Sequence, residues 1–371
     1  MKVKNVNFFL LRYPLERRYG NASGLKTERV SLVIRLETSD GVTGWGEGFA
    51  ERTYPHHWEE AAKIIRGSEL HDAPNIVDRI AKFDIALAGG VDVALWDLRG
   101  KLAGMSVANL LGGAYRNSQP AYASLHNVND EPDIVKSALE ESQSALDAGF
   151  RALKMKVGWH PVETDIAWVN AVTEALSPGV SLALDANRSM DLPTARRFIR
   201  ALKDPGAISW FEEPVANTHS FGYSDLRNSI DIAIAGGETM SAPMIQEVIR
   251  QRAMDIINPD LVGHGGFRRM THFWHAASVN GLRLIPHVFD GQISRVAALH
   301  FLASQPDWSE TRSHFRAPPL EYDTAHNPLR DEILCENLVP LEDGSIAVPS
   351  GPGLGVEVND SLVRKYTVAQ G

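Results

Sequence analysis

Cysteine is almost absent from this sequence, because Cys335 is the only one among 371 residues. A single cysteine cannot form a disulfide within its own chain, so no disulfide framework supports the fold. This composition is typical of the reducing cytoplasm, and we expect a cytoplasmic protein.

Long apolar runs and an excess of positive charge are also missing. The run from Phe8 to Leu11 is too short for a membrane span or for the core of a signal peptide. The net charge of -9 argues against nucleic acid, which is bound by neutralising phosphates with Lys and Arg. With 44% hydrophobic and 22% charged residues, the chain has ordinary globular composition and suits one barrel-sized domain or two packed domains.

Residues 1–119 are predicted to form an α+β domain. Residues 31–48 alternate apolar and polar side chains on both sides of Ser39-Asp40-Gly41, which is a hairpin turn signal. A helical pattern follows at residues 88–104. The glycines of "GWGEG" lack the spacing and the strand-to-helix context of a dinucleotide fingerprint, so we expect no nucleotide site there.

From residue 120 to residue 328, short apolar strands alternate with amphipathic helices. Such units imply a parallel sheet, and eight strands closing on themselves form a β/α barrel. An open, doubly wound sheet is the structural alternative. Residues 329–371 become β-like again and are expected to return to the first domain. The predicted fold class is therefore α/β, with a barrel and an α+β capping domain.

A polar residue stands at the C-terminal end of nearly every predicted barrel strand. Catalytic groups of β/α barrels occupy these ends, because they meet at one mouth of the barrel. The sequence therefore predicts one polar site built from many strands. Its candidate residues are Lys154 and Lys156, Asp185 and Asn187, Glu212 and Glu213, Glu238, Asp260, His287 and Glu321.

Three of these carboxylates, Asp185, Glu212 and Glu238, end three consecutive strands and should converge. Unpaired carboxylates repel one another unless protons or a cation intervene. A set of hard oxygen donors suits Mg²⁺, so we interpret the three as metal ligands. Each alone could instead be a helix N-cap or part of a surface salt bridge. Glu213 should point to the opposite face and is the weaker ligand candidate.

His287 and Asp260 end adjacent strands and form a predicted catalytic dyad, since an Asp that accepts from one ring nitrogen makes the imidazole more basic. Across the mouth, Lys154 and Lys156 point the same way from one strand. One lysine can neutralise an anionic substrate group while its charge lowers the pKa of the other toward that of a base. His126 could contact a substrate, but we do not favour it.

The ordered motifs "LKMKVG", "LDAN", "WFEEP", "GGET", "NPDLVGHGG", "PH" and "LEYD" resemble the enolase superfamily, and within it the mandelate racemase subgroup. The resemblance covers essentially the whole chain. It implies a modified (β/α)7β barrel, with a capping domain formed by the N-terminal segment and the C-terminal tail. It also implies Mg²⁺ on Asp185, Glu212 and Glu238, and a substrate that loses the proton α to its carboxylate.

The resemblance further assigns roles to the other residues. Lys156 would be one base, and His287, polarised by Asp260, the acid or base on the opposite face. Lys154 and a protonated Glu321 would bind the substrate carboxylate. Asn187 would orient a substrate hydroxyl or a lysine, and Tyr19 is a candidate contact from the cap loops at residues 17–26 and 50–57.

The expected function is dehydration of an acid sugar, an aldonate or aldarate, by Mg²⁺, Lys156 and His287. The alternative is a racemase or epimerase of a 2-hydroxy acid that uses the same two bases. No lysine follows Asp260 in Leu261-Val262-Gly263, which argues against muconate cycloisomerases and dipeptide epimerases. A non-catalytic member that binds an acid without turnover is the less favoured possibility. We expect a homo-oligomer, because symmetric assembly is common among such enzymes.

Overall fold

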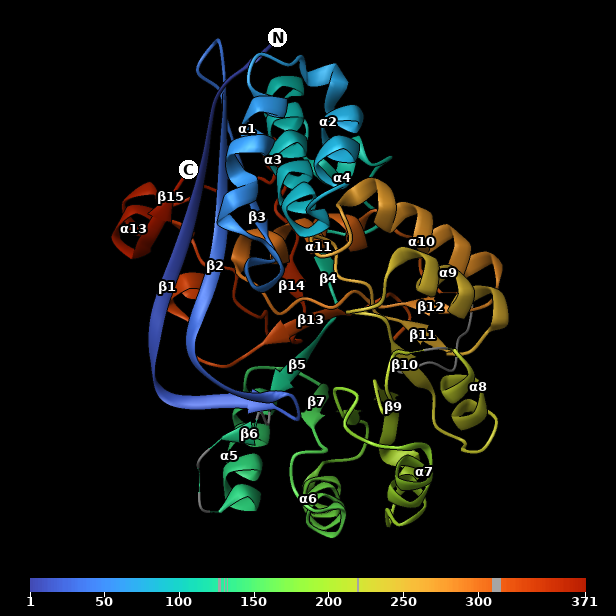
Figure 1. The fold of residues 1–371 in the computed structure, drawn as a ribbon. Helices are drawn as coiled ribbons and strands as arrows, with labels where there is room; N and C mark the ends of the chain where they lie inside the picture. Colours follow the sequence, from blue (N-terminus) through green and yellow to red (C-terminus); the bar gives the residue numbers. More distant parts are fainter. Residues whose placement is uncertain (126–127, 130, 132, 219, 309–314) are drawn as a thin grey trace.

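Eight short parallel strands form the central sheet of the computed structural model (Figure 1), which describes residues 1–125, 128–129, 131, 133–218, 220–308 and 315–371. His126 lies outside these residues. The strand order is β12-β11-β10-β9-β8-β7-β5-β13. The strands are β5 (Ala121–Leu125), β7 (Ala152–Lys156), β8 (Ser181–Asp185), β9 (Ile208–Glu212), β10 (Ile234–Gly236), β11 (Ile256–Ile257), β12 (Arg283–Leu284) and β13 (Leu320–Asp323).

One helix connects each strand of this sheet to the next, which gives the (β/α)7β order and confirms the predicted α/β class. A short helix, α12 (Pro328–Asp331), follows β13. The connecting helices are α5 (Ile134–Asp147), α6 (Val162–Ala175), α7 (Leu192–Arg200), α8 (Phe221–Arg227), α9 (Ala242–Gln251), α10 (Phe267–Val279) and α11 (Gln292–Ala303).

A separate antiparallel sheet forms the cap, in the order β15-β1-β2-β3. Its strands are β1 (Val3–Asn21), β2 (Gly24–Thr38), β3 (Thr43–Gly48) and β15 (Thr367–Gln370). The predicted turn lies between β2 and β3, where Gly41 has a φ of +83° that favours glycine. Because β15 pairs with β1, the C-terminal tail returns to the N-terminal sheet as expected.

The long β1–β2 hairpin extends from the cap alongside the barrel (Figure 1). Near its turn it pairs with β6 (Val128–Asn129), which follows the first barrel strand. The hairpin therefore brings cap residues to the barrel. The remaining elements are α1 (Trp58–Ile65), α2 (Ala73–Ile80), α3 (Ile85–Ala103), α4 (Val107–Leu110), α13 (Asp360–Tyr366), β4 (Ser118–Gln119), β14 (Ile346–Ala347) and the 3-10 turns Ala50–Arg52, Pro55–His57, Leu70–Asp72 and Pro205–Ala207.

Helix α3 packs closely on the loop that follows β11. A Cβ added at Gly89 would lie 1.9 Å from the carbonyl oxygen of Val262, so only glycine fits at this contact. Close by, Asp92 accepts a hydrogen bond from the backbone N–H of Phe267 at 2.8 Å. These contacts hold the cap against the loop that carries Asp260. No helix in the described residues combines the length and the apolar character needed to cross a bilayer.

Candidate active site

Strand alternation places the polar candidates on the inner face of the barrel. Side chains two or four positions apart on a strand point the same way. An apolar layer fills the interior with Tyr122, Ala152, Ala183, Trp210, Ala235, Ile256 and Ile285. The residues that follow this layer at those intervals include Lys154 and Lys156 on β7, Asp185 on β8, Glu212 on β9 and His287 after β12.

The three candidate metal ligands are buried where their strands end. Asp185 and Glu212 are the last residues of β8 and β9, Glu238 lies two residues after β10, and the three are 0%, 1% and 8% exposed. Helices α7 and α9 are capped by other side chains, those of Asp191 and Ser241. These carboxylates are therefore neither helix N-caps nor members of surface salt bridges.

Each of the three carboxylates is paired with a cationic side chain of the same site. Burial alone would raise the pKa of every buried acid, and it raises the pKa of Glu212 to about 7. At Asp185 the two lysine charges outweigh burial, and its pKa lies below the usual value. The pairs and their N···O distances are Lys156–Asp185 (2.5 Å), Lys154–Glu212 (3.4 Å) and His287–Glu238 (3.1 Å).

The donor chemistry of the site fits Mg²⁺, which prefers carboxylate and amide oxygens. Asn187 Oδ1 is buried and has no hydrogen-bond partner among the described residues, so it is a further free oxygen beside Asp185. Within the described ranges, no three acidic, imidazole or thiol side chains already enclose one point. Each carboxylate instead contacts a cationic side chain of the site.

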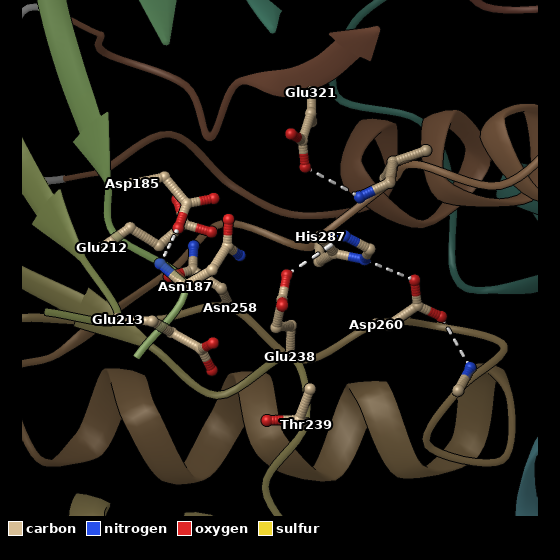
Figure 2. A network of polar contacts seen from close by, with 12 residues as sticks. Asp185, Asn187, Glu212, Glu213, Glu238, Thr239, Asn258, Asp260, His287 and Glu321 are labelled. Atoms are coloured by element: carbon tan, nitrogen blue, oxygen red, sulfur yellow. Dashed lines mark hydrogen bonds and ion pairs between the residues drawn. The ribbon is translucent and has the colours of Figure 1, made fainter. Parts of the chain in front are cut away.

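His287 lies between two carboxylates (Figure 2). Its Nδ1 is 2.9 Å from Asp260 Oδ2, and its Nε2 faces Glu238. Asp260 is itself fixed, because its Oδ1 accepts the backbone N–H of Gly263 at 2.6 Å. Burial lowers the pKa of His287, but Glu238 and Asp260 outweigh it and raise the pKa to about 10. The structure thus brings the predicted dyad together with a protonated imidazole.

Lys154 was expected to lower the pKa of Lys156, but neighbouring carboxylates outweigh this effect in the structure. The charge of Lys154 and burial both lower the pKa of Lys156, but the carboxylate of Asp185 raises it above the usual value. The pKa of Lys154 is also raised, since Glu212 and Glu321 outweigh its burial. Both lysines are therefore ammonium groups, and the expectation of a lowered pKa at Lys156 is wrong for this state of the site.

Glu321 also differs from the expectation that it is protonated. Burial favours its neutral form, but Lys154 Nζ lies 2.6 Å from Oε1 and holds the pKa of Glu321 at about 2. Its Oε2 accepts the backbone N–H of Val288 at 3.0 Å. This bond joins β13 to the segment after β12. In the described residues, β12 and β13 are not paired by backbone hydrogen bonds. Glu321 is therefore an ionised partner of Lys154 in this structure.

Glu213 is buried apart from the lysine pair. Its backbone has a φ of +38°, its Oε1 accepts from Asn217 at 2.8 Å, and its Oε2 lies 3.1 Å from Arg188. Burial, followed by the charge of Glu238, raises the pKa of Glu213 to about 8. Its contacts support its status as the weaker ligand candidate.

A cavity of about 490 Å³ joins the cap to the barrel mouth. Tyr19 lines it, and so does Asn187. Lys26 and the segment Ala50–Arg52 from the predicted cap loops also line it, but Arg17 pairs with Glu131 on the surface instead. Sequence reasoning missed several further lining residues, for which no motif gave a signal. Among them are Arg29, Phe289, Asp290 and Asn327.

Two other histidines are buried among backbone groups. His264 Nε2 lies 2.8 Å from the carbonyl oxygen of Met240, and His300 Nε2 lies 2.9 Å from that of Leu354. Burial lowers the pKa of both rings, which therefore stay neutral. Neither lines the cavity that contains His287.

Two segments of the chain match known protein families. Residues 19–112 match the family described as "Mandelate racemase / muconate lactonizing enzyme, N-terminal domain", and residues 137–362 match "Enolase C-terminal domain-like". The chain is 32% identical to D-galactarolactone cycloisomerase of Agrobacterium fabrum, with 99% of both chains covered. It is 30% identical to arabinonate dehydratase of Saccharolobus solfataricus, with 92% of this chain and 95% of that one covered.

The fold is also similar to solved structures. L-talarate dehydratase from Polaromonas sp. JS666, complexed with Mg and L-glucarate, superposes with a TM-score of 0.84 at 28% identity and covers 100% of this chain and 98% of that one. The 3,6-anhydro-D-galactonate cycloisomerase from Zobellia galactanivorans gives a TM-score of 0.85 at 27% identity over the full length of both chains. Dehydratases and cycloisomerases of sugar acids thus both occur among the similar proteins.

Proposed function

This chain belongs to the mandelate racemase/muconate lactonizing enzyme subgroup of the enolase superfamily, and from that premise we propose that it is a Mg²⁺-dependent acid-sugar dehydratase. The enzyme removes the proton α to a carboxylate of an aldonate or aldarate, and the β-hydroxyl leaves as water. The product is a 2-keto-3-deoxy acid.

The placement of one amine and one imidazole around a single cavity carries this proposal. Lys156 comes from β7 and His287 from the segment after β12. Four strands lie between β7 and β12 in the sheet order, and both residues line the cavity. A substrate carbon between them would meet a base on one side and an acid on the other. That arrangement suits removal of a proton and expulsion of a neighbouring oxygen.

Electrostatic stabilisation of the product of proton abstraction is the main physical requirement. A proton α to a carboxylate is weakly acidic, and its removal leaves a dianionic enediolate. Mg²⁺ held by Asp185, Glu212 and Glu238 would supply positive charge beside the substrate carboxylate. The buried ammonium of Lys154 adds a second positive charge from β7.

The proton transfers balance with two groups of this chain. Lys156, once its amine is neutral, takes the α-proton, and the electron pair of the C–H bond forms the enediolate. The imidazolium of His287 gives its proton to the β-hydroxyl, the C–O bond breaks, and water leaves. The resulting enol then tautomerises to the keto acid, gaining a proton at C3 and losing the proton of its C2 hydroxyl to water. Asp260 orients His287, while Glu321 fixes Lys154.

The remaining predicted contacts serve recognition. Asn187 and Tyr19 line the same cavity and present an amide and a phenol to the substrate hydroxyls. The substrate partner is therefore a small carboxylate rich in hydroxyl groups. Self-association into a homo-oligomer stays a prediction.

The alternative is racemisation or epimerisation of a 2-hydroxy acid. It is supported by the same observation, because two acid–base groups facing one carbon from opposite sides can remove a proton on one face and return it on the other. Reaction in D₂O separates the two. Epimerisation gives deuterium at C2 with inverted configuration and no loss of water, whereas dehydration gives the keto acid.

A ring oxygen at the β-position would leave by the same route as a hydroxyl. The similarity to D-galactarolactone cycloisomerase supports including lactones among the substrates to test. His287 would then protonate the departing ring oxygen, and the ring would open without net loss of water.

The test is an NMR screen of the purified protein with Mg²⁺ against aldonates, aldarates and their lactones. The expected result is a 2-keto-3-deoxy product from at least one of them, with no product from the Lys156→Met variant. An active wild-type protein that yields only epimers supports the alternative. Absence of every one of these reactions across the panel overturns the proposal.

A further inference from the structure

Arg29 is a buried guanidinium in the wall of the same cavity. It comes from β2 of the cap, is 4% exposed and stacks on the ring of Tyr19, with 4.1 Å between Cζ and the ring centroid. Phe289, which follows His287 after β12, lies 5.4 Å away by the same measure. The two rings hold the guanidinium rigidly where the cap meets the barrel.

The hydrogen-bonding capacity of Arg29 is largely unused. Its Nε and Nη2 are buried and donate to no acceptor in the described part of the chain. Nη2 lies 3.3 Å from Asp323 Oδ2, without hydrogen-bond geometry, and that oxygen also receives Nη1 of Arg330 at 2.7 Å. Buried donors left unsatisfied are costly, so an acceptor is expected at this position when the site is in use.

Arg29 shares its nearest carboxylate with a second guanidinium. Arg29 and Arg330 share Asp323, Arg330 also contacts Asp331, and Arg295 donates to the carbonyl oxygen of Asp323. The single carboxylate of Asp323 therefore cannot neutralise both Arg29 and Arg330. A buried charge of this kind calls for a compensating anion.

We propose that Arg29 binds the distal carboxylate of the substrate, so that the substrate is a dicarboxylic acid sugar, an aldarate, rather than an aldonate. This inference rests on the proposed function, because it assumes that the other end of the substrate lies at Lys156 and the metal ligands. One guanidinium with unused donors at Nε and Nη2 matches the two oxygens of a carboxylate in a bidentate pair.

The two ends of the cavity are close enough for a six-carbon chain to reach both. Lys156 Nζ lies 5.8 Å and Arg29 Cζ 5.4 Å from the centroid of the Phe289 ring, so the two atoms are no more than about 11 Å apart. An extended carbon chain advances about 1.2 Å per bond, or about 5 Å from C2 to C6. With contacts of about 3 Å at each end, such a chain spans up to about 11 Å and can therefore reach both groups.

The other cations that line the cavity are already engaged. Lys26 pairs with Glu51 on the surface of the cap. Arg52 donates to the carbonyl oxygen of Glu238 at 2.9 Å and stacks on Phe49. Arg52 therefore supports the segment that carries a metal ligand, and its loss should weaken all substrates alike.

Unpartnered acceptors lie in the same cavity. Asp290 Oδ2 and Asn187 Oδ1 are buried and accept no hydrogen bond from the described residues. Between a metal end and a guanidinium end, these oxygens are suited to the hydroxyl groups of a sugar chain. The cavity thus offers the three kinds of contact that an aldarate requires.

The experiment compares matched aldarates and aldonates as substrates of the wild type, Arg29→Met and Arg29→Lys. In Arg29→Met, kcat/KM for aldarates should fall by about 30- to 100-fold, as for loss of a charge-assisted hydrogen bond, and that for aldonates by less than about threefold. Arg29→Lys keeps the positive charge but loses the bidentate geometry, so its kcat/KM for aldarates should lie between those of the wild type and Arg29→Met. Arg12→Met, an exposed arginine of the adjacent β1, is the matched control and should leave both activities unchanged.

Three results overturn the inference: a wild type that prefers aldonates, equal losses on both substrate classes in Arg29→Met with its thermal unfolding unchanged, or no loss in either variant. If Arg29→Met does not fold, the comparison of Arg29→Lys with Arg12→Met decides. If the wild type turns over neither class, the proposed function fails separately. Calorimetry with a six-carbon aldarate and Mg²⁺ then tests Arg29 alone: weaker binding to the variants supports the distal site, and equal binding contradicts it.

Discussion

Replacing His287 with glutamine separates the two proton transfers of the proposed reaction. The imidazole that should protonate the leaving hydroxyl is removed, while Lys156 on the opposite side of the cavity is retained. General acid catalysis contributes about 10²- to 10⁴-fold, so the rate of dehydration should fall by that factor. Exchange of the α-proton with D₂O should continue, because it requires only Lys156 and the metal site.

Asp260→Asn should also slow dehydration, by less than His287→Gln does, while exchange of the α-proton continues. The 2.9 Å bond from His287 Nδ1 to Asp260 is charge-assisted, and such bonds contribute about 1.5–3 kcal/mol. Its loss should lower kcat by about 10- to 100-fold. An asparagine oxygen can still accept the N–H of Gly263, so the local backbone should be unchanged.

The assay is ¹H NMR in D₂O, which records loss of the C2 proton signal and appearance of the keto acid in the same sample. Thermal unfolding of each variant controls for folding. If His287→Gln abolishes exchange and dehydration together while Mg²⁺ binding is intact, or if it dehydrates at the wild-type rate, the assigned role of His287 is wrong.

Three further predictions concern stability. Gly89→Ala should destabilise the protein by about 1–3 kcal/mol in chemical denaturation, because its Cβ would overlap the Val262 carbonyl; an unchanged midpoint would contradict the close packing. Burial raises the pKa of Asp92 to about 7, so its contribution to stability is present in acid and lost as the pH rises from about 4 to 7, and Asp92→Asn should gain about 2 kcal/mol on the wild type between pH 5 and 7. A pH-independent difference would refute this. Lys154→Met leaves buried carboxylates without their cation and should cost about 3 kcal/mol without Mg²⁺, part of which added Mg²⁺ should restore; denaturation with and without the metal checks it.

The inner face of the barrel could be predicted from the sequence because strand alternation is local. Once Ala152 points inward, Lys154 and Lys156 must follow, and the same rule places Asp185 and Glu212. The order of strands and helices was also predictable, because the apolar patterns of strands and the amphipathic patterns of helices are local features of the sequence. Their meeting at one mouth follows from the parallel arrangement of the strands.

Protonation states were harder to predict than positions. The sequence suggested a neutral Glu321 and a lysine of lowered pKa, but both depend on which ion pairs form. In the structure Lys154 contacts Glu321, and Lys156 contacts Asp185, so these groups are charged. Such pairings depend on distances of a few ångströms between neighbouring strands, which no motif encodes.

Arg29 could not be found from the sequence at all. It lies in an alternating strand of the cap, where an arginine usually faces solvent. It reaches the active-site cavity only because the β1–β2 hairpin extends to the barrel and pairs with β6. That contact joins residues far apart in the chain.

The most direct test of the whole account is a calorimetric titration of the purified protein with Mg²⁺. We predict binding of one ion per chain in the wild type, and affinity at least about 100-fold weaker in Asp185→Asn, Glu212→Gln and Glu238→Gln. Wild-type affinity in all three variants, or full activity in a chelator with no ion bound, would contradict the account.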